Sequence, residues 1–174
     1  RRVDDALSRY IEFAKATFTN TMRLDHLKIL IDCANGAAYK VAPMIFWELG
    51  ADIIVIGDQP NGRNINQDCG STKTQNLKEE VKGNNADLGI AFDGDGDRLV
   101  IIDENGDQVN GDHLLGMIAL SLKKKNLLKN KNIVSTIMAT KSLENYLKSI
   151  DLKLIRTKVG DRYVIEKMLD IGSN

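Results

Sequence analysis

Short apolar runs alternate with longer segments of helical periodicity along most of the chain, and this alternation restricts the possible folds most. The run LKILI at 27–31 is followed by the Asn35-Gly36 turn, by apolar residues at helical spacing and by a second apolar run. This order is typical of a β-α-β unit. The expected strands are 27–31, 53–56, 88–92, 99–102, 133–138 and 152–156, and the expected helices are 41–49, 77–81, 112–122, 142–150 and 161–169. The sequence therefore predicts an α/β fold.

Two polar segments interrupt the apolar runs. Residues 57–72 read GDQPNGRNINQDCGST, which is too long and too polar for a simple turn. We expect an exposed, functional loop there. The pair Asn105-Gly106 lies between apolar runs and predicts a hairpin from the strand 99–102 to Gln108-Val109.

A second alternating block begins directly after this hairpin, with Asp112 as the expected N-cap of its first helix. We place a boundary near 107–111, which gives two domains, 1–107 and 108–174. The chain starts at Arg1 rather than Met and ends without a helix stop signal. We therefore expect a fragment of a longer protein.

The charge balance excludes several classes of partner. Lys and Arg together number 24, as do Asp and Glu, so no bulk field would attract nucleic acid or an anionic membrane. No apolar run approaches the roughly 20 residues that span a bilayer, and no secretion signal is visible. We expect a cytoplasmic protein with neither nucleic-acid nor membrane partners. Cys33 and Cys69 share no metal-ligand spacing and are expected to be reduced and structural.

The segment DGDGDR at 93–98 carries the clearest chemistry. Alternate residues of an extended or tightly turned backbone project to one side, so Asp93, Asp95 and Asp97 can converge while the two glycines allow a tight turn. Three such carboxylates repel one another unless a cation lies between them, and an all-oxygen site favours Mg²⁺, Ca²⁺ or Mn²⁺ over zinc. The planar donors of Arg98 suit a phosphate oxygen beside the metal. A metal ion and an arginine together stabilise the charge on a phosphoryl group during its transfer, so this segment indicates phosphoryl-transfer chemistry.

Two other interpretations of this segment are possible. A solvated acidic turn is disfavoured because three aspartates alternating with two glycines follow a buried strand. An EF-hand calcium loop fits the spacing of the three aspartates and Glu104. However, Arg98 occupies the position where that motif requires glycine, and the flanking segments are predicted strands rather than helices.

Several segments resemble the α-D-phosphohexomutases. They are ADLGIAFDGDGDR at 86–98, RYIEF at 9–13, IDCANGA at 31–37, NGRNIN and CGST within 57–72, and KVGDRYVIEK at 158–167. DGDGDR is highly specific for this superfamily, and KVGDRY and CGST are most similar to its bacterial phosphoglucosamine mutase branch. The resemblance covers essentially the whole chain. It implies two successive three-layer α/β blocks with mixed sheets, in which 1–107 resembles the second domain and 108–174 the first part of the third.

The resemblance also implies a function. Such enzymes have four domains and interconvert glucosamine 6-phosphate and glucosamine 1-phosphate through a phosphoserine and a bisphosphate intermediate, which serves UDP-N-acetylglucosamine and cell-wall precursor synthesis. By resemblance, Asp93, Asp95 and Asp97 would hold Mg²⁺ and Arg98 would lie beside the transferring phosphate. Lys158 resembles a third-domain lysine that reaches the reacting centre. The implied partners are a phosphorylated hexosamine and the missing first and fourth domains of the same chain.

No serine of this sequence has flanking residues similar to the family's phosphoserine loop, and the sugar-selecting motif and the fourth-domain phosphate clamp are absent. We therefore expect the fragment alone to be inactive. Two alternatives remain open. The chain could come from a phosphomannomutase or phosphoglucomutase, or it could be a non-catalytic module that binds a divalent metal.

Overall fold

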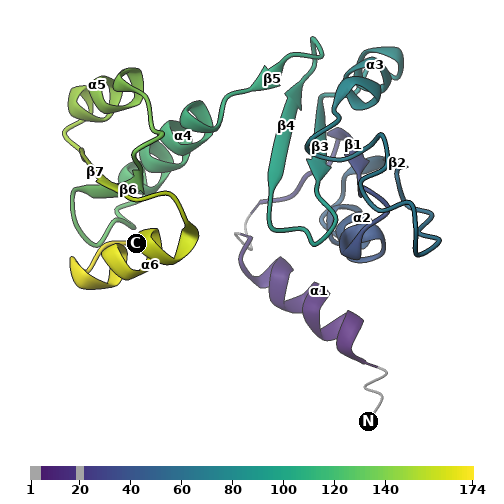
Figure 1. Ribbon diagram of the computed structural model, residues 1–174, viewed down its shortest axis with the longest axis horizontal. Coiled ribbons are helices and arrows are strands. Elements are labelled where there is room, and N and C mark those ends of the chain that lie inside the picture. Colours follow the sequence, from purple (N-terminus) through teal and green to yellow (C-terminus); the bar gives the residue numbers. More distant parts are fainter. Residues whose placement is uncertain (1–4, 19–21) are drawn as a thin grey trace. The chain divides into compact units, whose positions relative to one another are not determined.

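The computed structural model describes residues 5–18 and 22–174 and divides into two compact units, with the division after Val109. Each unit combines helices with a sheet (Figure 1). The α/β prediction is therefore confirmed.

The first unit is built on a five-stranded mixed sheet. Its strands are β1 (Lys28–Asp32), β2 (Asp52–Ile56), β3 (Leu88–Phe92), β4 (Leu99–Asp103) and β5 (Gln108–Val109), in the order β2-β1-β3-β4-β5. β1 pairs in parallel with β2 and β3, whereas β4 is antiparallel to both β3 and β5. The predicted hairpin between β4 and β5 is thus confirmed. Because β1, β2 and β3 are parallel, their carboxyl ends meet at one edge of the sheet.

Helices cover both faces of this sheet. They are α1 (Ala6–Ala16), the 3₁₀ turn η1 (Ala37–Tyr39), α2 (Val41–Glu48) and α3 (Gln75–Gly83). Alternate residues of β1 face opposite ways, so Ile29 and Ile31 join the core on the α2 face while Leu30 joins the core on the α3 face. This two-sided burial explains why β1 reads as an unbroken apolar run.

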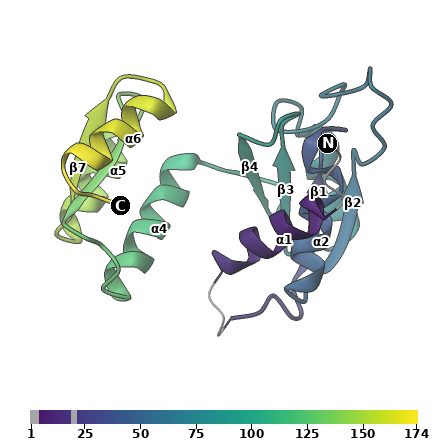
Figure 2. The same ribbon diagram turned by 90° about the horizontal axis from the view of Figure 1, so that it is seen from below.

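Helix α1 is an element that the sequence analysis did not assign. It lies beside α2, as Figure 2 shows, and buries Ile11. Lys15 forms an ion pair with Glu48 at the end of α2. One apolar anchor and one ion pair leave most of this helix exposed.

The second unit contains two parallel strands, β6 (Asn132–Thr136) and β7 (Lys153–Thr157). Its helices are α4 (Gly111–Lys124), α5 (Lys141–Ser149) and α6 (Asp161–Asp170). Leu143 and Leu147 of α5, Ala119 of α4 and Leu154 of β7 share one core.

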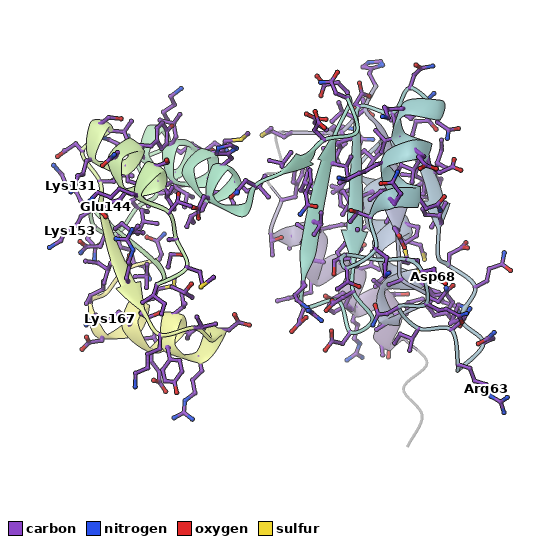
Figure 3. The ribbon with its side chains drawn as sticks, turned by 45° about the horizontal axis from the view of Figure 1, so that its top comes forward. Arg63, Asp68, Lys131, Glu144, Lys153 and Lys167 are labelled. Atoms are coloured by element: carbon purple, nitrogen blue, oxygen red, sulfur yellow. The ribbon has the colours of Figure 1, made fainter. Side chains whose placement is uncertain are left out.

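Glu144, labelled in Figure 3, links α5 to β7 through an ion pair with Arg156. Its carboxylate accepts hydrogen bonds from Lys148 (2.8 Å) and Lys141 (3.0 Å) of the same helix and from Arg156 of β7 (2.8 Å). These contacts, first that of Lys148 and then those of Arg156 and Lys141, lower the pKa of Glu144 to about 2.

Two local expectations were wrong. The strand predicted over 133–138 ends at Thr136, because Ala139 closes a turn by donating its N–H to the Thr136 carbonyl oxygen (3.1 Å). The N-cap of α4 is Asn110 rather than Asp112. The Asn110 side chain accepts from the Asp112 N–H (2.8 Å), and the Asp112 carboxylate accepts from the N–H of Thr140 (2.8 Å). Within residues 5–18 and 22–174, no helix has both the length and the apolar character needed to cross a bilayer.

Candidate metal site

The segment 93–98 connects β3 to β4 at the sheet edge where the parallel strands end. The structure brings Asp93, Asp95 and Asp97 together, with one carboxylate oxygen of each lying within 4.8 Å of the others. Asp93 is 1% exposed, whereas Asp95 and Asp97 are exposed to solvent. The flanking elements are antiparallel strands rather than the two helices that an EF-hand requires, so the EF-hand alternative is wrong.

Arg98 holds Asp93 in two ways. Its Nε donates to Asp93 Oδ2 (2.6 Å) and its backbone N–H donates to Oδ1 (3.1 Å). Burial raises the pKa of Asp93, but these hydrogen bonds outweigh it and lower the pKa to about 2. Asp93 is therefore ionised, and its two oxygens have fixed directions.

Asp97 shows the opposite shift. Its hydrogen bond to Asp93, followed by partial burial and the negative charges of Asp93 and Asp95, raises the pKa of Asp97. Crowded carboxylates resist ionising together, and a cation among them removes that resistance. Carboxylate oxygens are the donors that hard divalent cations prefer. The donor set of these three residues therefore fits a divalent cation such as Mg²⁺.

The metal loop, residues 93–98, has close neighbours on two sides. On one side, Ala37 donates its N–H to the Gly94 carbonyl oxygen (2.8 Å), and a Cβ added to Gly36 would collide with that same carbonyl group. On the other side, a Cβ added to Gly94 would lie 2.6 Å from Ile65 Cδ1 in the long loop 57–72. A side chain at Gly36 would meet backbone, whereas one at Gly94 would meet the end of the exposed Ile65 side chain, so the requirement for glycine is stronger at Gly36.

The long loop 57–72 is tied to the sheet edge rather than free in solvent. Asn66 donates its N–H to the Ala34 carbonyl oxygen (2.8 Å), and Ser71 donates to the Phe92 carbonyl oxygen (2.8 Å). Cys69 is buried. Figure 3 shows Arg63 at the outer end of this loop, pointing away from the rest of the unit. The loop is thus exposed at its tip and packed against the metal loop at its base.

Both cysteines are free and buried, in agreement with the structural role expected for them. Burial, with smaller contributions from the negative charges of Asp32 and Asp58, raises the pKa of Cys33 to about 12. Burial also raises the pKa of Cys69. Neither thiol forms a thiolate readily at neutral pH.

Lys158, the other predicted site residue, belongs to the second unit. It directly follows β7 and is exposed, with its ammonium group 5.9 Å from the centre of the Tyr163 ring. This distance is within the range of a cation–π contact, which limits the positions of a long side chain.

One buried acid next to the site was missed by the sequence analysis. Asp32 ends β1 and is 0% exposed. Burial raises the pKa of its carboxyl group above the ordinary value, and backbone hydrogen bonds from Gly70 and Ala34 offset only part of that rise. The available signal was an aspartate that directly follows the apolar run LKILI.

Comparisons with known proteins agree with this architecture. The family model for phosphoglucomutase/phosphomannomutase alpha/beta/alpha domain II matches residues 8–106, and the model for domain III matches residues 110–174. A phosphoglucosamine mutase of Dinoroseobacter shibae is 54% identical over 100% of this chain, and one of Campylobacter hominis is 52% identical over 100%. The chain spans only 39% of the length of each of these relatives.

Solved structures show the same fold. A phosphoglucomutase/phosphomannomutase family protein from Burkholderia thailandensis superposes with a TM-score of 0.79 at 24% identity and covers 96% of this chain and 36% of its own. An N-acetylglucosamine-phosphate mutase of the alpha-D-phosphohexomutase superfamily, in its apo form, has a TM-score of 0.70 at 23% identity, covering 94% of this chain and 39% of its own. The chain belongs to the phosphoglucomutase/phosphomannomutase family, with domain II matched by residues 8–106 and domain III by residues 110–174.

Proposed function

We propose that this chain is the metal-binding part of a phosphoglucosamine mutase, which interconverts glucosamine 6-phosphate and glucosamine 1-phosphate through a phosphoserine and a bisphosphate intermediate. The curated relatives quoted above, at 54% and 52% identity, carry that name. Because the chain spans 39% of their length, the phosphoryl donor and the remaining substrate contacts are proposed to come from other parts of the full protein.

The observation that carries the proposal is the convergence of Asp93, Asp95 and Asp97 beside Arg98. This family generally uses a divalent metal, and we propose Mg²⁺ for this chain. When bound, the ion supplies positive charge to the oxygens of the phosphoryl group. The three carboxylates would hold the ion, and the hydrogen bonds from Arg98 keep Asp93 ionised and in place for that role.

Arg98 is proposed to contact the transferring phosphate. Its Nε is engaged by Asp93, while its side chain is 66% exposed. Within residues 5–18 and 22–174, the two terminal guanidinium nitrogens make no hydrogen bond, so they are free to donate to phosphate oxygens. Guanidinium donors in this position stabilise the charge that shifts as the phosphoryl group moves.

Lys158 is proposed to assist proton transfer or to stabilise phosphate charge, as the KVGD motif implies. Its ammonium group is exposed and is restrained by the Tyr163 ring. A lysine in such a place supplies a single compact positive charge rather than a planar fork of donors.

The proposal is tested in a chimera. The 174 residues of this chain replace the matching segment of the Dinoroseobacter shibae enzyme, which is 54% identical over that segment. Conversion of glucosamine 6-phosphate to glucosamine 1-phosphate is then measured with Mg²⁺. We expect a folded, active chimera and a loss of at least about 100-fold when Asp95→Asn is introduced, because a charge that stabilises the transition state is lost.

The matched control is Asp107→Asn, which removes one exposed carboxylate from the β4–β5 turn and should leave the rate unchanged. A folded chimera that binds metal but has no activity, beside an active parent, would support the non-catalytic module instead. The sugar preference is tested separately with the full-length protein, by comparing glucosamine 6-phosphate with mannose 6-phosphate and glucose 6-phosphate. Preference for either of the latter two would favour a phosphomannomutase or phosphoglucomutase.

A further inference from the structure

Asp32 is a fully buried carboxylate that forms no ion pair within the described residues. Its Oδ1 accepts the N–H of Ala34 (2.9 Å) and its Oδ2 accepts the N–H of Gly70 (2.7 Å). Isolated charges are costly to bury, and charge-assisted bonds from backbone N–H groups are what make such a site tolerable. The arrangement ties the end of β1 to the base of the loop 57–72.

The base of the loop 57–72, at Gly70 and Ser71, is in turn hydrogen-bonded next to the metal loop. Ser71, next to Gly70, donates its N–H to the carbonyl oxygen of Phe92, and Phe92 immediately precedes Asp93. Gly70 lies close to both neighbouring segments, since an added Cβ would lie 2.6 Å from Ala34 Cβ and 2.7 Å from the Phe92 carbonyl oxygen. Two hydrogen bonds, from Gly70 to Asp32 and from Ser71 to Phe92, therefore connect Asp32 to the residue that precedes Asp93.

We propose that Asp32 is a positioning residue for the metal site: by fixing Gly70 and Ser71 against Phe92, it sets the place of Asp93. This inference rests on the metal site proposed above. Asp32 itself is not assigned to the cation, and its effect is indirect.

The test variant is Asp32→Asn, which keeps the shape of the side chain. An amide has one acceptor oxygen and one donor nitrogen, so it can satisfy only one of the two N–H groups that converge on Asp32. The other N–H, at Ala34 or at Gly70, is left facing a donor, and in either case the link between the end of β1 and Gly70 is weakened. We expect release of the Gly70 and Ser71 amides.

Two quantities are measured on the 174-residue chain. Hydrogen exchange by NMR reports the Gly70 and Ser71 amides, and Mn²⁺ titration followed by electron paramagnetic resonance reports the affinity of the metal site. For Asp32→Asn we expect faster exchange at both amides and an affinity about tenfold weaker, as for loss of groups that orient metal ligands.

Two controls separate positioning from charge and from general stability. Asp58→Asn removes one exposed negative charge from the long loop and should leave the affinity unchanged. Leu77→Ala opens a cavity in the α3-face core without touching Gly70, and it too should leave the affinity of the folded protein unchanged. If Asp32→Asn does not fold, Gly70→Ala takes its place, because the added Cβ displaces the same segment from Ala34 and Phe92. It should weaken Mn²⁺ binding to a similar extent.

The proposal is overturned if folded Asp32→Asn, or Gly70→Ala in its place, binds Mn²⁺ as tightly as the wild type. It is also overturned if Asp58→Asn weakens binding as much as Asp32→Asn. Failure of the metal site itself is a different result, in which the wild type binds no Mn²⁺ or Asp95→Asn binds it equally well.

Discussion

Gly36→Ala probes the close approach between the turn after β1 and the metal loop. The added Cβ would lie 2.7 Å from Gly94 Cα and 2.8 Å from its carbonyl carbon, and closer still to the carbonyl oxygen. Carbon atoms pack best about 3.5–4.0 Å apart, so relief requires a backbone shift of about 1 Å. Overpacking of this kind costs about 1–3 kcal/mol, and loss of the hydrogen bond from Ala37 to Gly94 adds about 1 kcal/mol.

We therefore expect Gly36→Ala to lower the free energy of unfolding of the first unit by about 2–4 kcal/mol and to weaken Mg²⁺ binding. Urea unfolding is followed through Trp47, the single tryptophan of the sequence, with circular dichroism alongside. The control is Gly83→Ala at the end of α3, where an added Cβ meets nothing within 4 Å. It should be neutral or stabilising by up to about 1 kcal/mol. Wild-type stability and metal affinity in Gly36→Ala would refute the reasoning.

Three further predictions concern the proposed chemistry and the second unit. In the chimera, Arg98→Ala should lower kcat more than it raises KM, and Arg98→Lys should not restore kcat, because lysine lacks the planar fork of donors. A wild-type kcat in Arg98→Ala would show that Arg98 is only a structural partner of Asp93. The purified chain alone should not convert glucosamine 6-phosphate, even with Mg²⁺ and the bisphosphate, since it holds no phosphoryl donor; turnover above a metal-free control would contradict this. The pKa of Glu144 is lowered from its ordinary value of 4.5 to about 2, so its contribution to stability is present above pH 4.5 and is lost as the pH falls through 2. Urea unfolding is followed through NMR signals of α5 in the wild type and in Glu144→Gln. The difference in their free energies of unfolding should be larger at pH 6 than at pH 2, and equal unfolding curves at pH 6 would refute the role of Glu144.

The periodicity of the sequence was sufficient to predict most strands and helices. β1 and β3 are buried on both faces, so their apolar runs are unbroken, and α2 and α3 repeat their apolar residues at helical spacing. Helix α1 was not assigned, although Leu7, Ile11 and Ala14 recur at helical spacing in its sequence. The convergence of Asp93, Asp95 and Asp97 was predictable because those residues are close in the chain.

Contacts between segments distant in sequence could not be predicted. Asp32 is bonded to Gly70, and Gly36 lies against Gly94; both pairs depend on the parallel strands ending at one edge. No local pattern gives the register that brings them together. The metal role of the three aspartates, the roles of Arg98 and Lys158 and the cytoplasmic location stay predictions.

The most direct test of the central claim is calorimetric titration of Mg²⁺ and Mn²⁺ into the 174-residue chain and its Asp95→Asn variant, with Asp107→Asn as the control for loss of one exposed carboxylate. The account predicts weak but measurable binding to the wild type and to Asp107→Asn. Loss of a group that orients a metal ligand lowers metal affinity by about 10- to 100-fold. Asp95→Asn removes a ligand itself, so the affinity should fall further than that. Undiminished affinity in Asp95→Asn would show that the cation is not held by Asp93, Asp95 and Asp97, and the proposed function would lose its basis.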